Sequence, residues 1–355
     1  MNECTNDISI PGGQPSRMKL QKWCLSEICG PSAQQKTEEK AMSDHSCNAW
    51  RVYDYIKIGL KGMPSSSFGG IDVTNRCNLK CKHCYFMKQH YKTELSTEEW
   101  LTKFEKLKAG GFPFLICGWI GGEPLLRKDL VEKGKRYFKS NIIFTNGTIE
   151  LPYWPDVAFS VSVHGTQDYH HRMTGADRGV YQMIKRNVDR DDLDVVIAFC
   201  ITRLNYECIE EMLKEWSHTA VRGIAFEFYT PMKGEGDELW LNWDERDRII
   251  DQLISLKKEY GGFIWLNDRL LRLMKSDLSQ KITQKCPFSK IGFSFDPMGK
   301  PKEPCQLGPD ADCSRCGCIL PFISMQLTHR GQLIPEFISS ASRRCLKALS
   351  KRRDS

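Results

Sequence analysis

The sequence lacks the features that would place the protein in a membrane or outside the cell. No stretch reaches transmembrane length. The first residues, "MNECTNDISIPGG", carry acidic and polar groups where a signal peptide has a basic start and an apolar run. Basic residues are scattered along the chain, except for six near its end: Arg343, Arg344, Lys347, Lys351, Arg352 and Arg353. We interpret this end as a solvated tail, with RNA or anionic lipid contact as the alternative. We predict a cytoplasmic protein with no membrane span and no nucleic-acid partner.

Cysteine, in contrast, is abundant, with 16 in 355 residues. In a long cytosolic chain, cysteines more often indicate metal, cluster or redox chemistry than disulfides. The length and the 41% hydrophobic content allow one large core and a small second unit. We therefore divide the chain into a poorly ordered arm without periodicity, a main domain, a small cysteine-rich domain and the basic tail. Their predicted bounds are 1–65, 66–262, 263–330 and 331–355.

Six short apolar runs in the main domain alternate with amphipathic stretches. One of these stretches, "STEEWLTKFEKLKAG", has Ser96 and Glu99 in the spacing of a capping box and Gly110 as a stop. Strand and helix patterns that alternate in this way predict a parallel sheet covered by helices. The predicted strands are 70–74, 114–118, 142–146, 158–163, 195–202 and 224–229, and the other predicted helices are 127–139, 179–188, 206–217 and 243–260.

The side-chain alternation favours a barrel over an open sheet. In "AFSVSVH", Phe159 and Val161 share one face of the strand, while Ser160, Ser162 and His164 share the other. Three further strands show a similar split. A strand buried on both faces would be apolar throughout, and a closed eight-stranded barrel would be filled with bulky branched residues. We predict an α/β fold, a partial (β/α)6 TIM-like barrel whose polar lumen holds a ligand. Burial of paired polar side chains is the alternative.

The segment "CNLKCKHCY" follows the first predicted strand and carries Cys77, Cys81 and Cys84. Three thiolates can hold three irons of a [4Fe–4S] cluster and leave the fourth iron open to a small-molecule ligand. A loop at this position sits at the C-terminal mouth of a barrel, where such folds carry out their chemistry. A structural zinc site with a distant fourth ligand is the alternative.

These motifs together resemble the radical S-adenosylmethionine (SAM) superfamily, over residues 69 to about 230. "CNLKCKHCY" is similar to the family's cluster loop, and "GWIGGEP" is similar to the segment that binds the amino group of SAM. Two glycines let a backbone approach a ligand, and an acidic side chain can accept from an ammonium group. The resemblance implies that four residues of this segment contact SAM: Gly121, Gly122, Glu123 and Pro124.

The resemblance extends to three further positions. Ser162 matches a contact to the ribose or carboxylate of SAM, although His164 stands where the family often has Asp. Asn146 in "FTNG" and Arg203 in "ITRLN" match positions that contact the cofactor. A surface arginine at the start of a helix is the alternative interpretation of Arg203.

The family chemistry implied by this resemblance is radical formation. A [4Fe–4S] cluster, reduced by an external one-electron donor such as flavodoxin or ferredoxin, cleaves SAM to a 5'-deoxyadenosyl radical that abstracts a substrate hydrogen. A polar lumen suits a peptide or a small polar metabolite as substrate. Asp72, Glu227 and Tyr229 share the polar face of their strands and are the candidate substrate contacts.

Five more cysteines crowd into "CPFSKIGFSFDPMGKPKEPCQLGPDADCSRCGC". The part "GFSFDPMGKPKEPC" predicts a β-hairpin that brings Cys286 and Cys305 to the same end. The segment resembles the auxiliary-cluster domains called Twitch or SPASM, and its five cysteines favour one auxiliary [4Fe–4S] cluster. The preferred ligands are Cys286, Cys305, Cys313 and Cys316, with Cys318 as the substitute. Zinc is the competing metal, because four thiolates suit either.

Two other functions stay open from the sequence. The C-terminal cysteine run has a weaker likeness to radical SAM enzymes that attach adenosyl groups to hopanoid lipids, which would need an apolar lumen. The chain also fits a zinc-stabilised binding protein without turnover, in which "GGEP" and the serines would be turn and packing residues.

Overall fold

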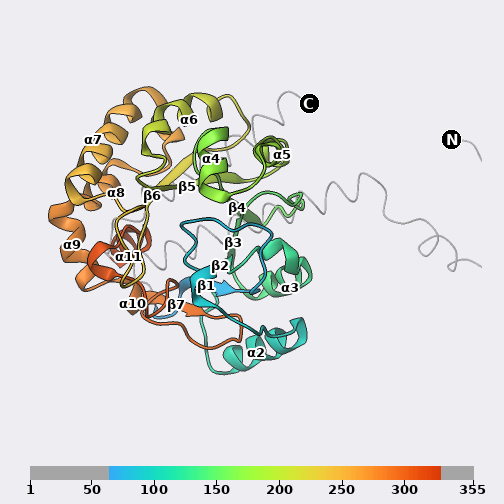
Figure 1. Ribbon diagram of the computed structural model, residues 1–355. Helices are drawn as coiled ribbons and strands as arrows, with labels where there is room; N and C mark the ends of the chain where they lie inside the picture. The colour runs from blue at the N-terminus through green and yellow to red at the C-terminus, as the bar shows by residue number, and fades with distance from the viewer. Residues whose placement is uncertain (1–63, 329–355) are drawn as a thin grey trace, which may run out of the picture. The chain divides into compact units, whose positions relative to one another are not determined.

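Figure 1 shows the computed structural model, which describes residues 64–328. The described residues all fall within one compact unit of the chain, Cys47–Ser355. The predicted arm, except for its last two residues, and the predicted basic tail lie outside the described residues. The domain boundaries stay a prediction.

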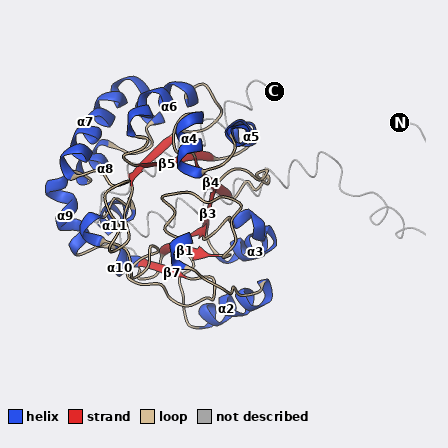
Figure 2. Cartoon of the chain, viewed as in Figure 1, coloured by secondary structure: helices blue, strands red, loops and turns tan. Residues whose placement is uncertain are grey.

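Seven parallel strands form one sheet in the order β6-β5-β4-β3-β2-β1-β7. Each of β2 to β6 is added beside the strand before it, which is the progression of a barrel. In Figure 2 the strands form an arc with the helices outside it. The predicted partial barrel is confirmed. The strands are β1 (Phe68–Asp72), β2 (Ile116–Ile120), β3 (Ser140–Thr145), β4 (Val157–Ser162), β5 (Val195–Ile201), β6 (Ile224–Phe228) and β7 (Gly292–Phe295).

The five predicted helices are present as α2, α3, α5, α6 and α7, although α3 ends at Gly134, before the predicted residue 139. Helices α4 and α8 to α11 were not predicted. Helix α2 begins after Ser96, whose hydroxyl accepts from the backbone of Glu99 while the Glu99 side chain accepts from the backbone of Ser96, so the predicted capping box is confirmed. The described α-helices are α2 (Thr97–Ala109), α3 (Lys128–Gly134), α4 (Gln167–Thr174), α5 (Arg178–Val188), α6 (Ile209–Trp216), α7 (Trp243–Tyr260), α8 (Asp268–Leu273), α9 (Ser276–Gln284), α10 (Phe288–Ile291) and α11 (Leu320–Thr328). None of these is long and apolar enough to cross a membrane.

The alternation along the strands separates a core from a lumen. Phe159 and Val161 of β4 are buried among the apolar side chains between sheet and helices, whereas Ser160 and Ser162 are half-buried on the other face. Strands β5 and β6 alternate in the same way. Large rings such as Trp119 fill the core, so the lumen face keeps the small and polar residues.

Strand β7 differs from the sequence prediction. The predicted hairpin is present, because the backbone N–H of Asp296 donates to Lys300 and that of Lys302 donates to Ser294. Its first arm, however, is the seventh strand of the barrel sheet and pairs with β1. A Cβ atom at Gly69 would lie 1.9 Å from the carbonyl oxygen of Phe293, so the glycine permits this pairing.

The cysteine segment that follows β7 reaches the opposite edge of the sheet. The backbone N–H of Phe228, at the end of β6, donates to the carbonyl of Gly317 at 3.0 Å. A Cβ atom at Gly317 would lie 2.4 Å from the Phe228 carbonyl oxygen. Residues 292–317 thus connect the two edge strands of the partial barrel, β7 and β6.

Candidate active site

Glu94 holds the loop that follows β1. Its Oε2 accepts from the Thr74 hydroxyl at 2.6 Å and from the Asn75 backbone at 2.8 Å, and its Oε1 accepts from Arg127 at 3.1 Å. The chain around Asn75 therefore leaves β1 in a defined direction, towards the first cysteine of the loop.

The three thiols of this loop are half-buried and influence one another. Burial, with the neighbouring charges of Cys84 and Cys77, raises the pKa of Cys81 to about 12. Burial also raises the pKa of Cys77 and of Cys84. Iron binds thiolates, so bound iron would offset this cost of ionisation, and thiols are the donor type that the predicted cluster requires. Within residues 64–328, no group of three or more His, Cys, Asp or Glu side chains is arranged to hold a metal ion.

The "GGEP" segment packs directly against this loop. The backbone N–H of Gly122 donates to Thr74 at 2.9 Å, and that of Glu123 donates to Arg76 at 2.8 Å. A Cβ atom at Gly122 would lie 1.9 Å from the Arg76 carbonyl oxygen, and Gly121 has a φ of +114°. Both glycines are therefore required for the close approach of the turn after β2 to the cysteine loop.

Glu123 is a buried carboxylate at the ends of β2 and β3. It accepts from the Leu125 backbone at 3.0 Å, from the Thr145 hydroxyl at 2.7 Å and from the Asn146 backbone at 2.8 Å. Burial raises its pKa, and these three hydrogen bonds oppose the rise. A carboxylate offers about four acceptor positions, so one is left for a ligand ammonium group. Pro124 begins the short 3-10 turn that follows (Pro124–Arg127).

Asn146 and Ser162 lie at the ends of neighbouring strands. The amide nitrogen of Asn146 donates to Asn78 at 2.8 Å and to the Cys77 sulfur at 3.8 Å. Asn146 therefore touches the cysteine loop directly. Ser162 is the last residue of β4 and is half-buried in register with Ala198 of β5, so it lies on the lumen face.

Three histidines also lie at this end of the barrel, and the sequence analysis assigned them no role. The ring centroids of His83 and His164 are 4.1 Å apart, and the rings of His164 and His170 are stacked. Burial lowers the pKa of His83 to about 4 and that of His164 well below its ordinary value. Neutral imidazoles therefore join the cysteine loop to the end of β4. The position of His83 directly before the third cysteine is the sequence signal that marks it.

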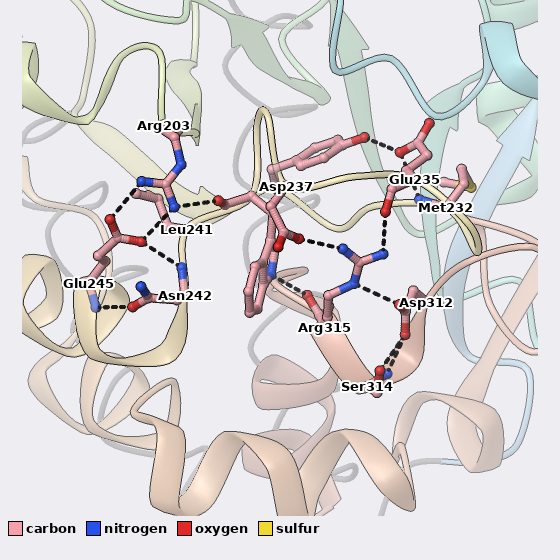
Figure 3. A network of polar contacts seen from close by, with 12 residues as sticks. Arg203, Met232, Glu235, Asp237, Leu241, Asn242, Glu245, Asp312, Ser314 and Arg315 are labelled. Carbon is pink, nitrogen blue, oxygen red and sulfur yellow. Dashed lines mark hydrogen bonds and ion pairs between the residues drawn. The ribbon is translucent and has the colours of Figure 1, made fainter.

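Arg203 has its own partner on the outside of the barrel. Its two terminal nitrogens bind both carboxylate oxygens of Glu245 at 2.7 and 2.8 Å, and one also donates to the Trp240 carbonyl (Figure 3). This bidentate pair ties the end of β5 to the N-terminus of α7. A cofactor contact by Arg203 stays a prediction.

Asp72, at the end of β1, is fully buried on the lumen face. Its Oδ2 accepts from the ammonium of Lys302 at 2.5 Å, and its Oδ1 has no hydrogen-bond partner in the described part of the chain. Burial raises the pKa of Asp72 to about 6, although the Lys302 charge lowers it. Lys302 also donates to Gln89 of the cysteine loop at 3.1 Å. The sequence analysis missed Lys302, because nothing in a loop sequence indicates that its charge is buried.

The other two candidate substrate contacts differ in their surroundings. Glu227 is half-buried on β6 beside Cys200 of β5, and its carboxylate accepts only a long bond of 3.5 Å from Ile319 among the described residues. Burial raises its pKa to about 7. The Tyr229 hydroxyl, in contrast, accepts from Lys88 at 2.8 Å and donates to Glu235 at 2.6 Å. Tyr229, Lys88 and Glu235, but not Glu227, line a cleft of about 410 Å³ between the cysteine loop and the loop after β6.

The five C-terminal cysteines influence one another's ionisation. Burial raises the pKa of Cys286, Cys305 and Cys316 to about 11, and neighbouring thiols, including Cys313, contribute to the rise. Burial also raises the pKa of Cys318, and Glu227, Cys316 and Cys305 add to that rise. The choice of four ligands among these five thiols stays a prediction, with Cys286, Cys305, Cys313 and Cys316 as the preferred set.

Buried Arg246 holds this cysteine segment on the end of β6. Its guanidinium donates to four carbonyl oxygens, including those of Tyr229 at 3.0 Å and Cys316 at 2.9 Å. Arg315 adds ion pairs to Asp312 and Asp237 on the surface (Figure 3). Five donors in a rigid fork suit an arginine to this bridging position.

Residues 71–215, which include the cysteine loop and the "GGEP" segment, match the radical SAM superfamily. These residues therefore form a radical SAM domain. Members of the superfamily are enzymes that use a [4Fe–4S] cluster and SAM, so the predicted family and the predicted SAM and SAM-binding [4Fe–4S] cofactors are confirmed.

Two curated relatives and one solved structure illustrate what the chain is similar to. It is 28% identical over 206 residues to Fe-coproporphyrin III synthase of Methanosarcina barkeri, covering 52% of this chain and 50% of that protein. It is 26% identical over 158 residues to the sporulation killing factor maturation protein SkfB of Bacillus subtilis, covering 41% and 38%. The structure of Streptococcus suis SuiB bound to its precursor peptide SuiA has a TM-score of 0.55 at 11% identity, covering 89% and 74%, and shows a shared fold. The chain spans half or less of the length of both curated relatives.

Proposed function

We propose that this radical SAM enzyme abstracts a hydrogen atom from a peptide or a small polar metabolite. The single observation that carries the proposal is the convergence of three mutually coupled thiols with Glu123 and Asn146 at one end of the barrel. When bound, the cofactors supply one-electron cleavage of the SAM sulfonium bond and a 5'-deoxyadenosyl radical.

The chain's own residues hold the reactants in this proposal. Cys77, Cys81 and Cys84 hold the cluster, and the free acceptor position of Glu123 takes the amino group of SAM. Asn146 fixes the loop at Cys77, and Ser162 contacts the ribose or carboxylate from the end of β4. An external one-electron donor of the flavodoxin or ferredoxin class supplies the electron.

Asp72 and Glu227 are the proposed substrate contacts in the lumen. The unpartnered Oδ1 of Asp72 and the weakly bonded carboxylate of Glu227 leave two acceptors free for donors on a substrate. An apolar lipid would give neither of these buried acceptors a hydrogen bond, which is costly. This observation favours a polar substrate over a hopanoid-like lipid. The names of SkfB and of the SuiB complex with SuiA give the peptide alternative its support.

The five C-terminal thiols, which influence one another's ionisation, support a second cluster. We propose Cys286, Cys305, Cys313 and Cys316 as its ligands, with zinc as the competing metal. Four thiolates would fill the site, so this cluster would pass electrons or brace the fold.

The test is anaerobic reconstitution of the wild type and of a Cys77/Cys81/Cys84→Ala variant, followed by iron analysis and a 5'-deoxyadenosine assay with dithionite and SAM. We expect the variant to lose about half of the iron and all SAM cleavage. Cys117→Ala, a buried thiol of β2, is the matched control and should keep both. A colourless, iron-free wild type without 5'-deoxyadenosine would support the zinc-stabilised binding protein instead.

A further inference from the structure

We infer that the exposed cations around the cysteine loop form a docking surface for an acidic one-electron donor protein. This inference rests on the proposed function, because it concerns how an electron reaches the cluster of that site. It names the surface, which the family resemblance leaves open.

The loop itself exposes its charged side chains to solvent and keeps its cysteines half-buried. From Arg76 to Lys82 the exposed positions alternate with inward ones: Arg76, Asn78, Lys80 and Lys82 are exposed, whereas Leu79 is buried. Cys77 and Cys81 lie between them and are half-buried. Positive side chains therefore stand on the solvent side of the same few residues that would hold the iron.

A neighbouring helix adds to this positive surface. The backbone N–H of Lys82 donates to the Met173 carbonyl at 2.9 Å, which brings the C-terminal end of α4 against the loop. Arg172, exposed at that end, packs over the ring of Tyr169 at 4.1 Å. Lys80, Lys82 and Arg172 thus belong to one surface region.

The charge of this region is largely uncompensated. Within residues 64–328, ion pairs engage Arg76 through Glu94 and Lys88 through Glu235, but none engages Lys80, Lys82 or Arg172. Two nearby acidic side chains oppose them: Glu238, which shares the cleft with Lys82, and Glu207, which accepts from the hydroxyl of the Tyr169 ring under Arg172. Unpaired surface charge is available to steer an oppositely charged partner.

The position also suits electron transfer. Electron tunnelling weakens steeply with distance, so a donor must approach the cluster closely. A partner that binds Lys80 and Lys82 comes within one residue of Cys81. For each SAM cleaved, the donor protein is oxidised by one electron, and that electron enters the sulfonium bond that breaks. An acidic flavodoxin or ferredoxin has the required charge and redox chemistry.

The test compares two reductants on the reconstituted enzyme and its Lys80→Glu/Lys82→Glu variant. With an acidic flavodoxin kept reduced, we expect the variant's rate of 5'-deoxyadenosine formation to fall about tenfold at low salt, because steering is lost. With dithionite, a small inorganic reductant, the two proteins should react alike. The wild-type rate with flavodoxin should also fall as ionic strength rises, as the Debye length shortens from about 10 Å to about 3 Å.

The matched control is Lys106→Glu/Lys108→Glu. It makes the same charge change on exposed residues of α2, at the opposite end of that helix from the cysteine loop. This control should keep the wild-type rate with flavodoxin. Calorimetric titration of each protein with oxidised flavodoxin gives a readout independent of turnover and should show weaker binding only for Lys80→Glu/Lys82→Glu.

Two outcomes would overturn the inference. Unchanged flavodoxin binding and rate in the variant would show that the donor docks elsewhere. An equal loss with dithionite would show that the lysines act within the site. If the wild type fails to cleave SAM even with dithionite, the proposed function fails. The binding titration alone then tests whether Lys80 and Lys82 bind flavodoxin.

Discussion

Glu227 is a carboxyl group that has few hydrogen-bond partners among the described residues. It lies on the lumen face of β6 with one long backbone hydrogen bond, and burial raises its pKa from 4.5 to about 7. A carboxyl group with such a pKa can give or take a proton near neutral pH. At the scale of a single residue, the lumen therefore offers acid–base capacity as well as polarity.

The raised pKa predicts a pH-dependent stability. The folded protein binds the Glu227 proton more tightly than the unfolded chain does, so the stabilising contribution is present below about pH 4.5 and is lost as pH rises through about 7. Between about pH 5 and about pH 8, the wild type should therefore lose more unfolding free energy than Glu227→Gln. Urea unfolding of the iron-free proteins across this range measures the difference, with exposed Glu132→Gln as the control. Parallel curves for the wild type and Glu227→Gln would contradict it.

At the scale of elements, the edge of β6 carries the C-terminal cysteines. The segment around Cys316 is joined to β6 through the Phe228–Gly317 backbone bond and through the Thr230 hydroxyl, which accepts from Gly317 at 2.8 Å. A strand edge with unpaired backbone groups needs such a cover. The same contacts that cover the edge position the thiols.

Gly317→Ala tests this dependence. The added Cβ atom would meet the Phe228 carbonyl oxygen at 2.4 Å, so the segment must move away from β6. We expect the reconstituted variant to lose the iron of the auxiliary site, about half of the total, while SAM cleavage with dithionite persists. Gly179→Ala, which has open space around the new Cβ atom, should keep all of its iron. A Gly317→Ala protein with full iron content would show that the segment is held by other contacts.

At the scale of the whole molecule, one buried ion pair joins distant parts of the chain. Asp72 and Lys302 are 230 residues apart in sequence, and their side chains are almost completely buried. The pair links the first strand of the barrel to the segment that bears the auxiliary cysteines. Three aromatic rings, Tyr85, Phe86 and Tyr91, lie within 6 Å of the lysine ammonium.

Lys302→Met should be strongly destabilising, because it leaves the Asp72 carboxyl buried without its partner. Removal of one member of a buried pair costs about 3–5 kcal/mol, whereas replacement of both members is often close to neutral. Asp72→Asn/Lys302→Met should therefore recover most of the lost unfolding free energy. A double-mutant cycle by urea unfolding measures the coupling, and additive effects of the two single changes would show that the pair contributes little.

Local patterns in the sequence were sufficient for the barrel and for its first cysteine site. Strands β1 to β6 lie within two residues of their predicted bounds, because period-two alternation reports directly on burial. The α2 cap was predictable because Ser96 and Glu99 bond within one turn. The loop of Cys77, Cys81 and Cys84 was recognisable because its three cysteines, the predicted cluster ligands, lie within eight consecutive residues.

Only the tertiary structure decided which distant residues meet. The pairing of β7 with β1, the burial of Lys302 against Asp72 and the backbone bond between Phe228 and Gly317 all join segments far apart in the chain. Local sequence patterns report on the face that a residue presents and on its nearest neighbours along the chain. Only the folded sheet determines which faces and edges of distant segments come together. In this protein, those contacts shape the lumen.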